Sequence, residues 1–327
     1  MSSPAFRNVF EPQAGRATRK IENAGASILK DSFRLSTLFL IGALVQSILF
    51  LVLPARYALL PTVILLLHAL ITTIIEVRSP AAWAAGTGKD LVPYKVSAQI
   101  PNQSYSPSSN EASIFGSTPA DKGIVVLHLG VRFNHPLGVL CPGGKEMGDH
   151  KKACDERVMA HIESSDNDFG CLGISSWQAV DEGESHSTML SVYYFRDMDG
   201  LNRFAHDAVH RKAWDYYAKE FYTKQTDGME GWKGRHIGVY HEAFYAPPGM
   251  WETIYANMQP TMLGRAMAPV KNQDTGKTEW VGTLVDARHK ALRSQWGRMG
   301  RSVGDRYPSG GGGGRDGYGT LKGDVGY

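Results

Sequence analysis

The sequence predicts an α+β fold in which a ferredoxin-like β-α-β-β-α-β domain follows a two-helix transmembrane hairpin. Two observations predict this organisation. Two uncharged apolar runs lie back to back at 35–53 and 57–75, and strand-like and helix-like patterns alternate after residue 123 in the ferredoxin-like order. The two helices cover one face of such a sheet, so the other face needs a second sheet, a partner subunit or a ligand.

The two apolar runs near the start of the chain predict a membrane anchor. Each run is about 19 residues long, close to the roughly 20 that a helix needs to cross hydrocarbon, and neither contains Asp, Glu, Lys or Arg. Only Pro54-Ala55-Arg56 separates them, which predicts a tight helical hairpin over 35–76. Two alternatives remain: a buried hairpin of a soluble domain, and a hairpin that dips into one leaflet, pinned by Pro54 and Pro61.

Basic residues predict the orientation of the hairpin. Only Arg56 lies between the runs, and the other nearby basic residues lie on the flanks: Arg7, Arg16, Arg19, Lys20, Lys30, Arg34, Arg78, Lys89 and Lys95. Because positive charge stays on the cytosolic side, we expect a protein of the endoplasmic reticulum membrane whose soluble part faces the cytosol. Asn102-Gln103-Ser104 is a glycosylation acceptor that would be used only if the soluble part were lumenal.

Composition and motifs argue against several classes of function. The formal net charge of +3 favours no nucleic-acid partner. The three cysteines are Cys141, Cys154 and Cys171, and an odd number without C-x-x-C predicts neither a disulfide framework nor a zinc ribbon. No G-x-G-x-x-G follows a strand and no Walker loop occurs, so we expect no nicotinamide or nucleotide site.

Changes in composition predict five regions along the chain. Ser, Pro, Asn and Gly are abundant over 79–122, as is typical of a linker, and five glycines follow Ser309. The basic stretch 286–301 carries apolar residues on one side, which favours a membrane-surface helix or a solvated charged tail. The predicted regions are a basic N-terminal tail (1–34), the hairpin (35–76), a flexible linker (77–122), the α+β domain (123–285) and a basic, Gly-rich C-terminal tail (286–327).

Local patterns predict the elements of the α+β domain. Apolar stretches rich in β-branched and aromatic residues predict strands over 123–133, 169–179, 188–195 and 236–245. Apolar residues among charges predict a surface helix over 148–164, and apolar residues near helical spacing predict a second helix over 197–221. A short helix is also expected over 250–258.

Strand alternation assigns the side chains of the first and fourth strands to the two faces of the sheet. In the fourth strand, Ile237, Val239 and His241 suit the helix-covered face. The open face then carries His128, Arg132 and Asn134 from the first strand and His236, Tyr240, Glu242 and Phe244 from the fourth. We expect these two strands to be neighbours at the sheet centre, so their titratable groups would form a candidate active site.

Three aromatic residues, Tyr193, Tyr240 and Phe244, are also expected on the open face. Such a face would be unusual in contact with water, which supports a covered pocket. The alternative is an ordinary exposed sheet face with no function.

A stripe of histidines lies on the second predicted helix. His206, His210 and Trp214 are spaced four residues apart. The pattern H-D-x-x-H is similar to the zinc-protease H-E-x-x-H, but Asp is one methylene shorter than Glu and no third ligand is evident. We therefore predict no metal site, and expect the stripe to pack in the core or line a pocket.

Several motifs together resemble a known family. They are 130–143 (GVRFNHPLGVLCPG), 194–196 (YFR), Leu201-x-x-Phe-Ala-His206, His210-Arg-x-Ala-Trp214 and 236–242 (HIGVYHE). Over residues 120–270 the chain resembles the fungal monooxygenase-like family of fumagillin-type biosynthesis. Ala208 and Val209 stand where members of that family often have Pro, which leaves a continuous helix open as an alternative there.

The resemblance implies the dimeric α+β barrel fold, in which two sheets pack across a dimer axis and each open face becomes a pocket. Related barrel enzymes include cofactor-free monooxygenases that oxidise electron-rich polyketides, and haem-binding dehydratases. No settled set of catalytic residues is carried over from the family.

We therefore expect a membrane-anchored, homodimeric monooxygenase that acts on a lipophilic terpenoid or polyketide in fungal secondary metabolism, with no cofactor. His236 or His128 would deprotonate the substrate, and Arg132 would hold the developing oxyanion. The residues expected to bind the substrate are Tyr240, Glu242, Trp177, Phe244, Tyr193, His206, His210 and Trp214.

Two alternative functions remain open. A haem-binding, dehydratase-like enzyme would use His206, His210 or His236 as the proximal ligand. A non-catalytic membrane scaffold would instead bind a pathway cytochrome or another partner through the same open face.

Overall fold

The computed structural model describes residues 6–16, 32–108, 113–160, 169–179, 188–222 and 234–301. The chain divides into two compact units. The sheet unit consists of Ala17–Leu91 and Val125–Phe244, and the terminal unit consists of Met1–Arg16, Val92–Ile124 and Tyr245–Tyr327. The predicted division at 123 and 285 is therefore wrong at its C-terminal end, because the residues after Phe244 belong with the N-terminal segments.

A four-stranded sheet forms the centre of the sheet unit. Its strands are β3 (Ile124–Phe133), β4 (Cys171–Gln178), β5 (Thr188–Phe195) and β6 (Ile237–Ala246). The spatial order is β4-β5-β3-β6, and β5 is antiparallel to both β3 and β4. The strands agree with the predicted β-α-β-β-α-β order, and β3 and β6 are neighbours as expected. The expectation that both lie at the sheet centre is wrong for β6, which forms an edge.

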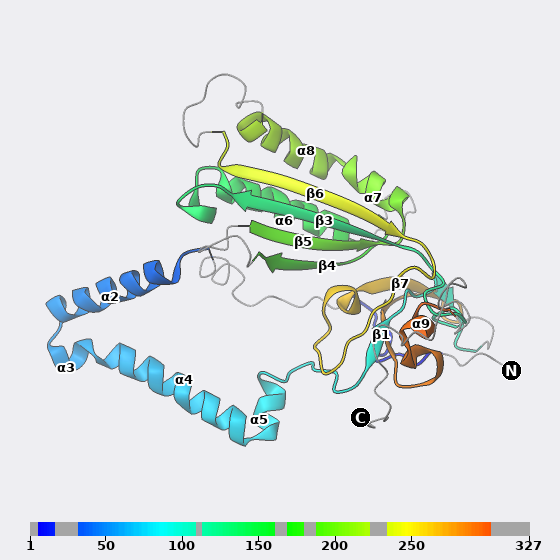
Figure 1. The fold of residues 1–327 in the computed structure, drawn as a ribbon, viewed down its shortest axis with the longest axis horizontal. Helices are drawn as coiled ribbons and strands as arrows, with labels where there is room; N and C mark the ends of the chain where they lie inside the picture. The colour runs from blue at the N-terminus through cyan, green and yellow to red at the C-terminus, as the bar shows by residue number, and fades with distance from the viewer. Residues whose placement is uncertain are drawn as a thin grey trace, which may run out of the picture. The chain divides into compact units, whose positions relative to one another are not determined.

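Three helices lie over one face of this sheet (Figure 1). They are α6 (Gly144–Met159), α7 (Met198–Ala205) and α8 (Ala208–Tyr217), and short helical turns follow β3 as η1 (Gly138–Leu140) and α8 as η2 (Ala218–Tyr222). The side chains that pack between helices and sheet are alternate residues of the strands and the apolar stripe of the helices, including Val125, Leu127, Tyr193, Phe195, Leu201 and Phe204.

The predicted helix over 197–221 is broken between α7 and α8. Asp207 has an extended backbone conformation, and its Oδ1 accepts a hydrogen bond of 2.9 Å from the amide of Val209. This is the arrangement of a helix N-cap. The continuous helix that Ala208 and Val209 left open does not form, because Asp207 starts a new helix instead.

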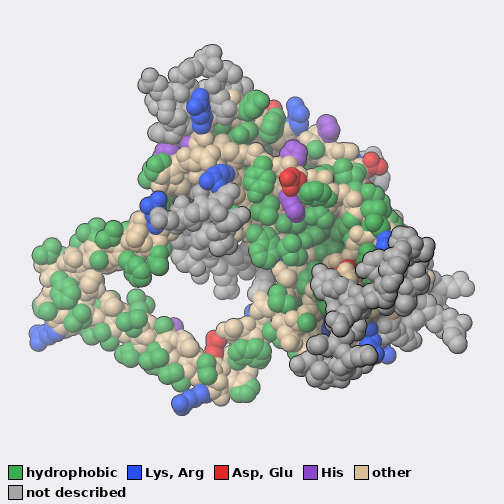
Figure 2. All heavy atoms as spheres, viewed as in Figure 1, with side chains coloured by type: hydrophobic (Ala, Val, Ile, Leu, Met, Phe, Trp, Pro, Cys, Tyr) green, Lys and Arg blue, Asp and Glu red, His purple; other side chains and the backbone are tan. Residues whose placement is uncertain are grey.

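The apolar runs form two long helices joined by a short one. These are α2 (Leu35–Val52), α3 (Ala55–Ala58) and α4 (Leu60–Arg78), followed by α5 (Pro80–Ala85). Their length and apolar composition make Leu35–Val52 and Ala55–Arg78 candidate membrane spans. No residue of α2 or α4 is buried, so they are not packed as core helices. Figure 2 shows hydrophobic side chains along both helices, with charges confined to their ends.

Short strands from distant parts of the sequence build the terminal unit. They are β1 (Val96–Ala98), β2 (Ser104–Tyr105), β7 (Met267–Asn272), β8 (Thr278–Gly282) and β9 (Leu284–Asp286). β1 is antiparallel to β9, β2 is parallel to β7, and β7 is antiparallel to β8. A short η4 (Met262–Arg265) precedes β7. The linker expected over 77–122 is therefore wrong for much of its length, because Val96, Ala98 and Tyr105 are buried in this unit.

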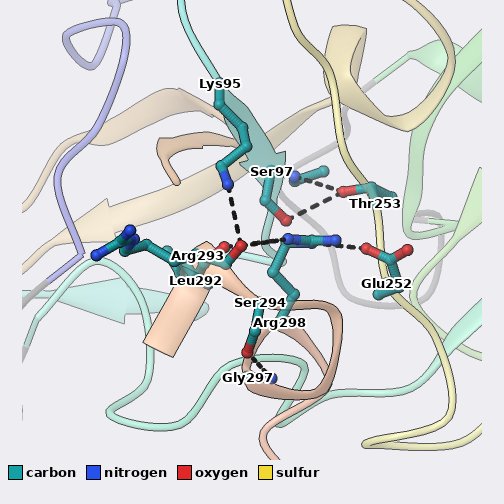
Figure 3. A network of polar contacts seen from close by, with 10 residues as sticks. Lys95, Ser97, Glu252, Thr253, Leu292, Arg293, Ser294, Gly297 and Arg298 are labelled. Carbon is teal, nitrogen blue, oxygen red and sulfur yellow. Dashed lines mark hydrogen bonds and ion pairs between the residues drawn. The ribbon is translucent and has the colours of Figure 1, made fainter. Parts of the chain in front are cut away.

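The end of the described chain is held in the terminal unit by a buried arginine (Figure 3). It contains η5 (Lys290–Arg293) and α9 (Gln295–Arg298). Arg298 Nε donates to Glu252 Oε2 at 2.7 Å, and its Nη1 donates to the carbonyl of Leu292 at 3.2 Å. Leu292 and Arg298 are each 5% exposed, so the membrane-surface helix expected over 286–301 is wrong.

The helix expected over 250–258 is also wrong. Val92 and Val96 form isolated β-bridges with Met258 and Tyr255, so this stretch is extended along β1. Most of the expected N-terminal tail and the Gly-rich stretch after 301 lie outside the described residues. Residues 6–16 are an exception to the expected tail, because Asn8 and Gln13 bridge Val285 and Trp280.

Candidate functional site

An apolar cavity of about 240 Å³ lies beneath the helices of the sheet unit. Strands β3 and β6 form its floor, and α6, α7 and α8 form its walls. Its lining consists of Leu129, Val131, Met147, Lys151, Cys154, Ala205, His210, Arg211, Ala213, Trp214, Tyr217, Val239 and His241. Clefts of this kind, mostly apolar with a few polar groups, are the usual binding sites for small molecules.

Local periodicity explains which side chains reach the cavity. On α8, His210, Ala213 and Trp214 lie three and four residues apart and therefore share one face. On β6, Val239 and His241 alternate toward the helices, as predicted for that register. Ala205 and Ala213 are small, which leaves space that larger side chains would fill.

His210 is held in one orientation at the cavity. Its Nδ1 lies 2.9 Å from the carbonyl oxygen of Ala205, across the break between α7 and α8. A neutral imidazole that donates this hydrogen bond from Nδ1 keeps a lone pair on Nε2. Burial lowers the pKa of His210 below its usual value; nearby His241 and Arg211 lower it further, while the bond to Ala205 partly opposes the shift. The lowered pKa favours the neutral form of His210, which can act as a base.

Several lining residues were not selected as candidates from the sequence. His241 was placed on the helix-covered face, where we expected a packed side chain, but it is exposed and lines the cavity. Lys151, Cys154, Arg211 and Tyr217 were also missed. Strand and helix periodicity could have placed all of them on the inner faces, but periodicity does not reveal whether that space is filled.

Tyr193 is buried on the helix-covered side, so its expected place on the open face is wrong. In β5, Tyr193 alternates with Phe195 toward the helices, and both are fully buried. The Tyr193 hydroxyl donates to Asp155 Oδ1 of α6 at 2.5 Å, and Lys151 binds the other carboxylate oxygen at 2.5 Å. Burial, together with the Asp155 charge, raises the pKa of Tyr193 well above its ordinary value.

The open face brings together part of the predicted site. His128 Nδ1 lies 4.0 Å from Glu242 Oε2, and the rings of His128 and Phe244 are 5.6 Å apart. The Tyr240 ring covers Gly130, where a Cβ would overlap it. Figure 2 shows acidic and histidine side chains among hydrophobic ones on this face.

The other open-face candidates lie around this group. Trp177 of β4 is exposed and shares the face through its pairing with Leu190. Arg132 Nε donates to Asn134 Oδ1 at 2.8 Å, and its Nη1 donates to Thr188 Oγ1 at 3.1 Å. The guanidinium expected to hold an oxyanion is therefore engaged by neighbouring side chains.

His236 does not join His128. It precedes β6, so strand alternation does not apply to it, and it is only 6% exposed. Its Nε2 lies 2.9 Å from the carbonyl oxygen of Pro142, and its ring packs edge-on against Phe221. The amide of Asn134 donates to the carbonyl of His236, so His236 lies beside the end of β3. His128 is six residues before Asn134, which places it about 20 Å away along an extended strand.

The histidine stripe is divided by the break before α8. His206 is exposed, with Nδ1 2.8 Å from the carbonyl oxygen of Asn202, whereas His210 and Trp214 line the cavity. Among the described residues, no cluster of three or more His, Cys, Asp or Glu side chains could hold a metal ion.

A β-α-β-β-α-β sheet with a small-molecule cavity under its helices defines an α+β domain of the ferredoxin-like class. Residues 124–263 match the family described as Monooxygenase af470-like. Monooxygenase af470 of Aspergillus fumigatus is 35% identical over 273 residues, which cover 84% of this chain and 90% of that protein. The chain belongs to the monooxygenase af470-like family, which confirms the resemblance found in its motifs.

Two solved structures are also similar to parts of the chain. A protein described as a putative antibiotic biosynthesis monooxygenase from Caulobacter crescentus CB15 is 13% identical and covers 38% of this chain and 90% of its own, with a TM-score of 0.25. Aldoxime dehydratase in complex with butyraldoxime is 11% identical and covers 67% of this chain and 46% of its own, with a TM-score of 0.34.

We predict that His236 stabilises the fold. His236→Ala removes a buried ring beside Phe221 and the hydrogen bond to Pro142, so it should lower the free energy of unfolding by about 2–4 kcal/mol. His128→Ala, at a half-buried position, should change it by less than about 1 kcal/mol. Chemical denaturation of both variants measures the difference. Equal stability of the two, with activity lost only in His236→Ala, would contradict this assignment.

Proposed function

We propose that this chain is a membrane-anchored monooxygenase that oxidises a lipophilic small molecule, a terpenoid or polyketide intermediate of fungal secondary metabolism. The observation that carries the proposal is the apolar cavity with the neutral His210 on its wall, in a chain of a monooxygenase family. An apolar lining favours a lipophilic substrate, because its burial removes apolar surface from water.

His210 is the proposed general base, in place of His236 or His128. Its Nε2 would take a proton from an acidic C–H of an electron-rich substrate. The carbanion would add O₂, and loss of water from the resulting hydroperoxide would leave a carbonyl group. This step is balanced without an external reductant, because oxidation of a CH₂ group to a carbonyl supplies the four electrons that reduce O₂.

We propose that the cavity takes no haem, the alternative cofactor. His210 has one feature of a metal-binding histidine, since its Nδ1 is held by a backbone carbonyl and its Nε2 faces away from that bond. However, a cavity of about 240 Å³ is small for a porphyrin, which is among the larger cofactors. We therefore propose chemistry that uses no haem.

The activity prediction concerns His210. His210→Ala should lower kcat/KM for anthrone, a probe with an acidic CH₂ group, by about 100-fold or more, measured by O₂ consumption. The exposed His206→Ala, four residues earlier, is the matched control and should retain activity. Because the pKa of His210 is lowered, wild-type activity should fall only as the pH drops below the ordinary histidine value of about 6.5.

Two outcomes would contradict this proposal. A Soret band in the absorption spectrum of the purified protein would favour the haem alternative. Wild-type protein that binds lipophilic compounds in the cavity but consumes no O₂ with any of them would favour the non-catalytic scaffold.

We also propose that α2 and α4 cross the endoplasmic reticulum membrane with both units on the cytosolic side. The helices have 18 and 19 residues, or about 27–29 Å at 1.5 Å per residue, close to the roughly 30 Å of the hydrocarbon core. Arg56, between them, would reach the lumenal headgroups, while Arg34 and Arg78 remain on the cytosolic side.

This topology predicts that protease added to intact microsomes digests both units. Asn102 should carry no glycan, so an endoglycosidase should cause no shift in mobility. As a control, the same microsomes opened with detergent should expose a lumenal marker protein that is protected before opening. Protection of the units, or a glycan on Asn102, would place them in the lumen.

The open sheet face supports the proposal of a homodimer. Tyr240, Phe244 and Trp177 are 42–52% exposed on that face, and a second copy would cover them. Phe244→Glu should therefore convert a dimer to a monomer, as measured by light scattering of the full chain in detergent. Met198→Glu changes an exposed residue on α7 and should leave the dimer intact. Wild-type protein that is monomeric at micromolar concentration would contradict the proposal.

A further inference from the structure

The lining of the cavity contains several basic side chains and no carboxylate among the described residues. Four lining residues are basic, namely Lys151, His210, Arg211 and His241, and none of the described lining residues is Asp or Glu. The rest of the lining is apolar except for the thiol of Cys154, the indole N–H of Trp214 and the hydroxyl of Tyr217. An apolar space bordered by basic groups alone favours a ligand that is apolar with a negative charge at one end.

Two of the four basic residues are already accounted for. Lys151 forms an ion pair with Asp155, whose other oxygen is held by Tyr193. Burial favours the neutral form of His210. Of the acids on or beside α8, Asp207 forms an ion pair with Arg157 at 2.9 Å, and Asp215 is exposed and does not line the cavity.

Arg211 and His241 remain available to a ligand. Both are exposed, one on α8 and the other on β6, and both line the cavity. Within the described parts of the chain neither forms an ion pair. They therefore form the polar end of an otherwise apolar space. Arg211 and His241 both contribute to the lowered pKa of His210, which agrees with their place beside it at the cavity.

We propose that the ligand of this cavity is an amphipathic carboxylic acid. Its apolar body would occupy the space between α8 and β3, and its carboxylate would bind Arg211 and His241. A guanidinium presents donors in a planar fork that matches the two oxygens of a carboxylate. The inference rests on the proposed function for the location of the site, and it names the substrate class as an acid.

The test compares three probes that share one aromatic body. These are 1-naphthaleneacetate, 2-(1-naphthyl)ethanol and 1-naphthylmethylammonium, titrated by calorimetry into the full chain in nanodiscs, with empty nanodiscs subtracted. The acid should bind at least about tenfold more tightly than the alcohol, and the ammonium compound should bind most weakly. Added salt should reduce the advantage of the acid. Equal affinity for acid and alcohol would overturn the proposal without the need for any variant.

Variants of Arg211 and Lys212 test which positive charge causes the preference for the acid over the alcohol. Arg211→Ala should weaken binding of the acid about tenfold and leave the alcohol unchanged, while Arg211→Lys should retain part of the preference. Lys212→Ala removes the same charge from the next residue of α8, which is exposed and does not line the cavity, and should have no effect. An equal loss in Lys212→Ala would show a general surface charge effect and overturn the proposal.

A cavity-filling variant separates this inference from the proposed function. Ala213→Phe should abolish binding of all three probes, and unchanged binding would show that the acid lies elsewhere and overturn the inference. Acid-selective binding without O₂ consumption would leave this inference standing and contradict the monooxygenase. Oxidation of neutral compounds without any preference for the acid would support the monooxygenase and contradict this inference.

Discussion

Asp207 makes the contacts on which the geometry of the cavity depends. One carboxylate oxygen caps α8 through the amide of Val209, and the other accepts hydrogen bonds from Nε and Nη2 of Arg157 on α6 at 3.1 and 2.9 Å. The Asp207 side chain therefore begins a new helix after α7 and connects the start of α8 to α6. The break also lets the His210 ring reach the carbonyl of Ala205, which a regular helix would use for its own backbone bonds. Backbone geometry, rather than a further side chain, thus orients the proposed base.

The layer between the helices and the sheet contains a packed aromatic core in one part and the cavity in another. Where Tyr193, Phe195 and Phe204 meet, large rings fill the interior. Where Ala205 and Ala213 face β3 and β6, small side chains leave a cavity. The chain stabilises itself with aromatic packing in one half of this layer and leaves the other half for a ligand. The ion pair between Lys151 and Asp155 borders both halves, because its carboxylate also receives the buried hydroxyl of Tyr193.

The proposed membrane anchor and the proposed site have related physical requirements. A lipophilic substrate partitions into a bilayer, so an enzyme held at the membrane surface meets it at a higher local concentration than a soluble enzyme would. A carboxylate on that substrate would keep one end at the interface, where the basic groups of the cavity could engage it. Each of these properties is a proposal, and they are consistent with one another because they follow from the same amphipathic chemistry.

Local patterns in the sequence were sufficient for the strands of the sheet unit and for the family, but not for the break between α7 and α8. The limits of β5 and the inward register of Ile237, Val239 and His241 agree with the prediction, because alternation is a property of each strand by itself.

Contacts between distant residues were not predictable in this way. Composition predicts a linker where β1 and β2 form, because these strands are short and pair with strands near residues 267–286. The candidate site was misjudged for a related reason. Alternation assigns His241 to the inner face, but the packing of the helices determines that a cavity lies beside it. Because β6 begins at Ile237, alternation does not apply to His236. The sequence by itself determined the order of the strands and the inward register of β6. The tertiary structure decided which face borders a cavity, because the cavity depends on the volumes of side chains from five elements at once.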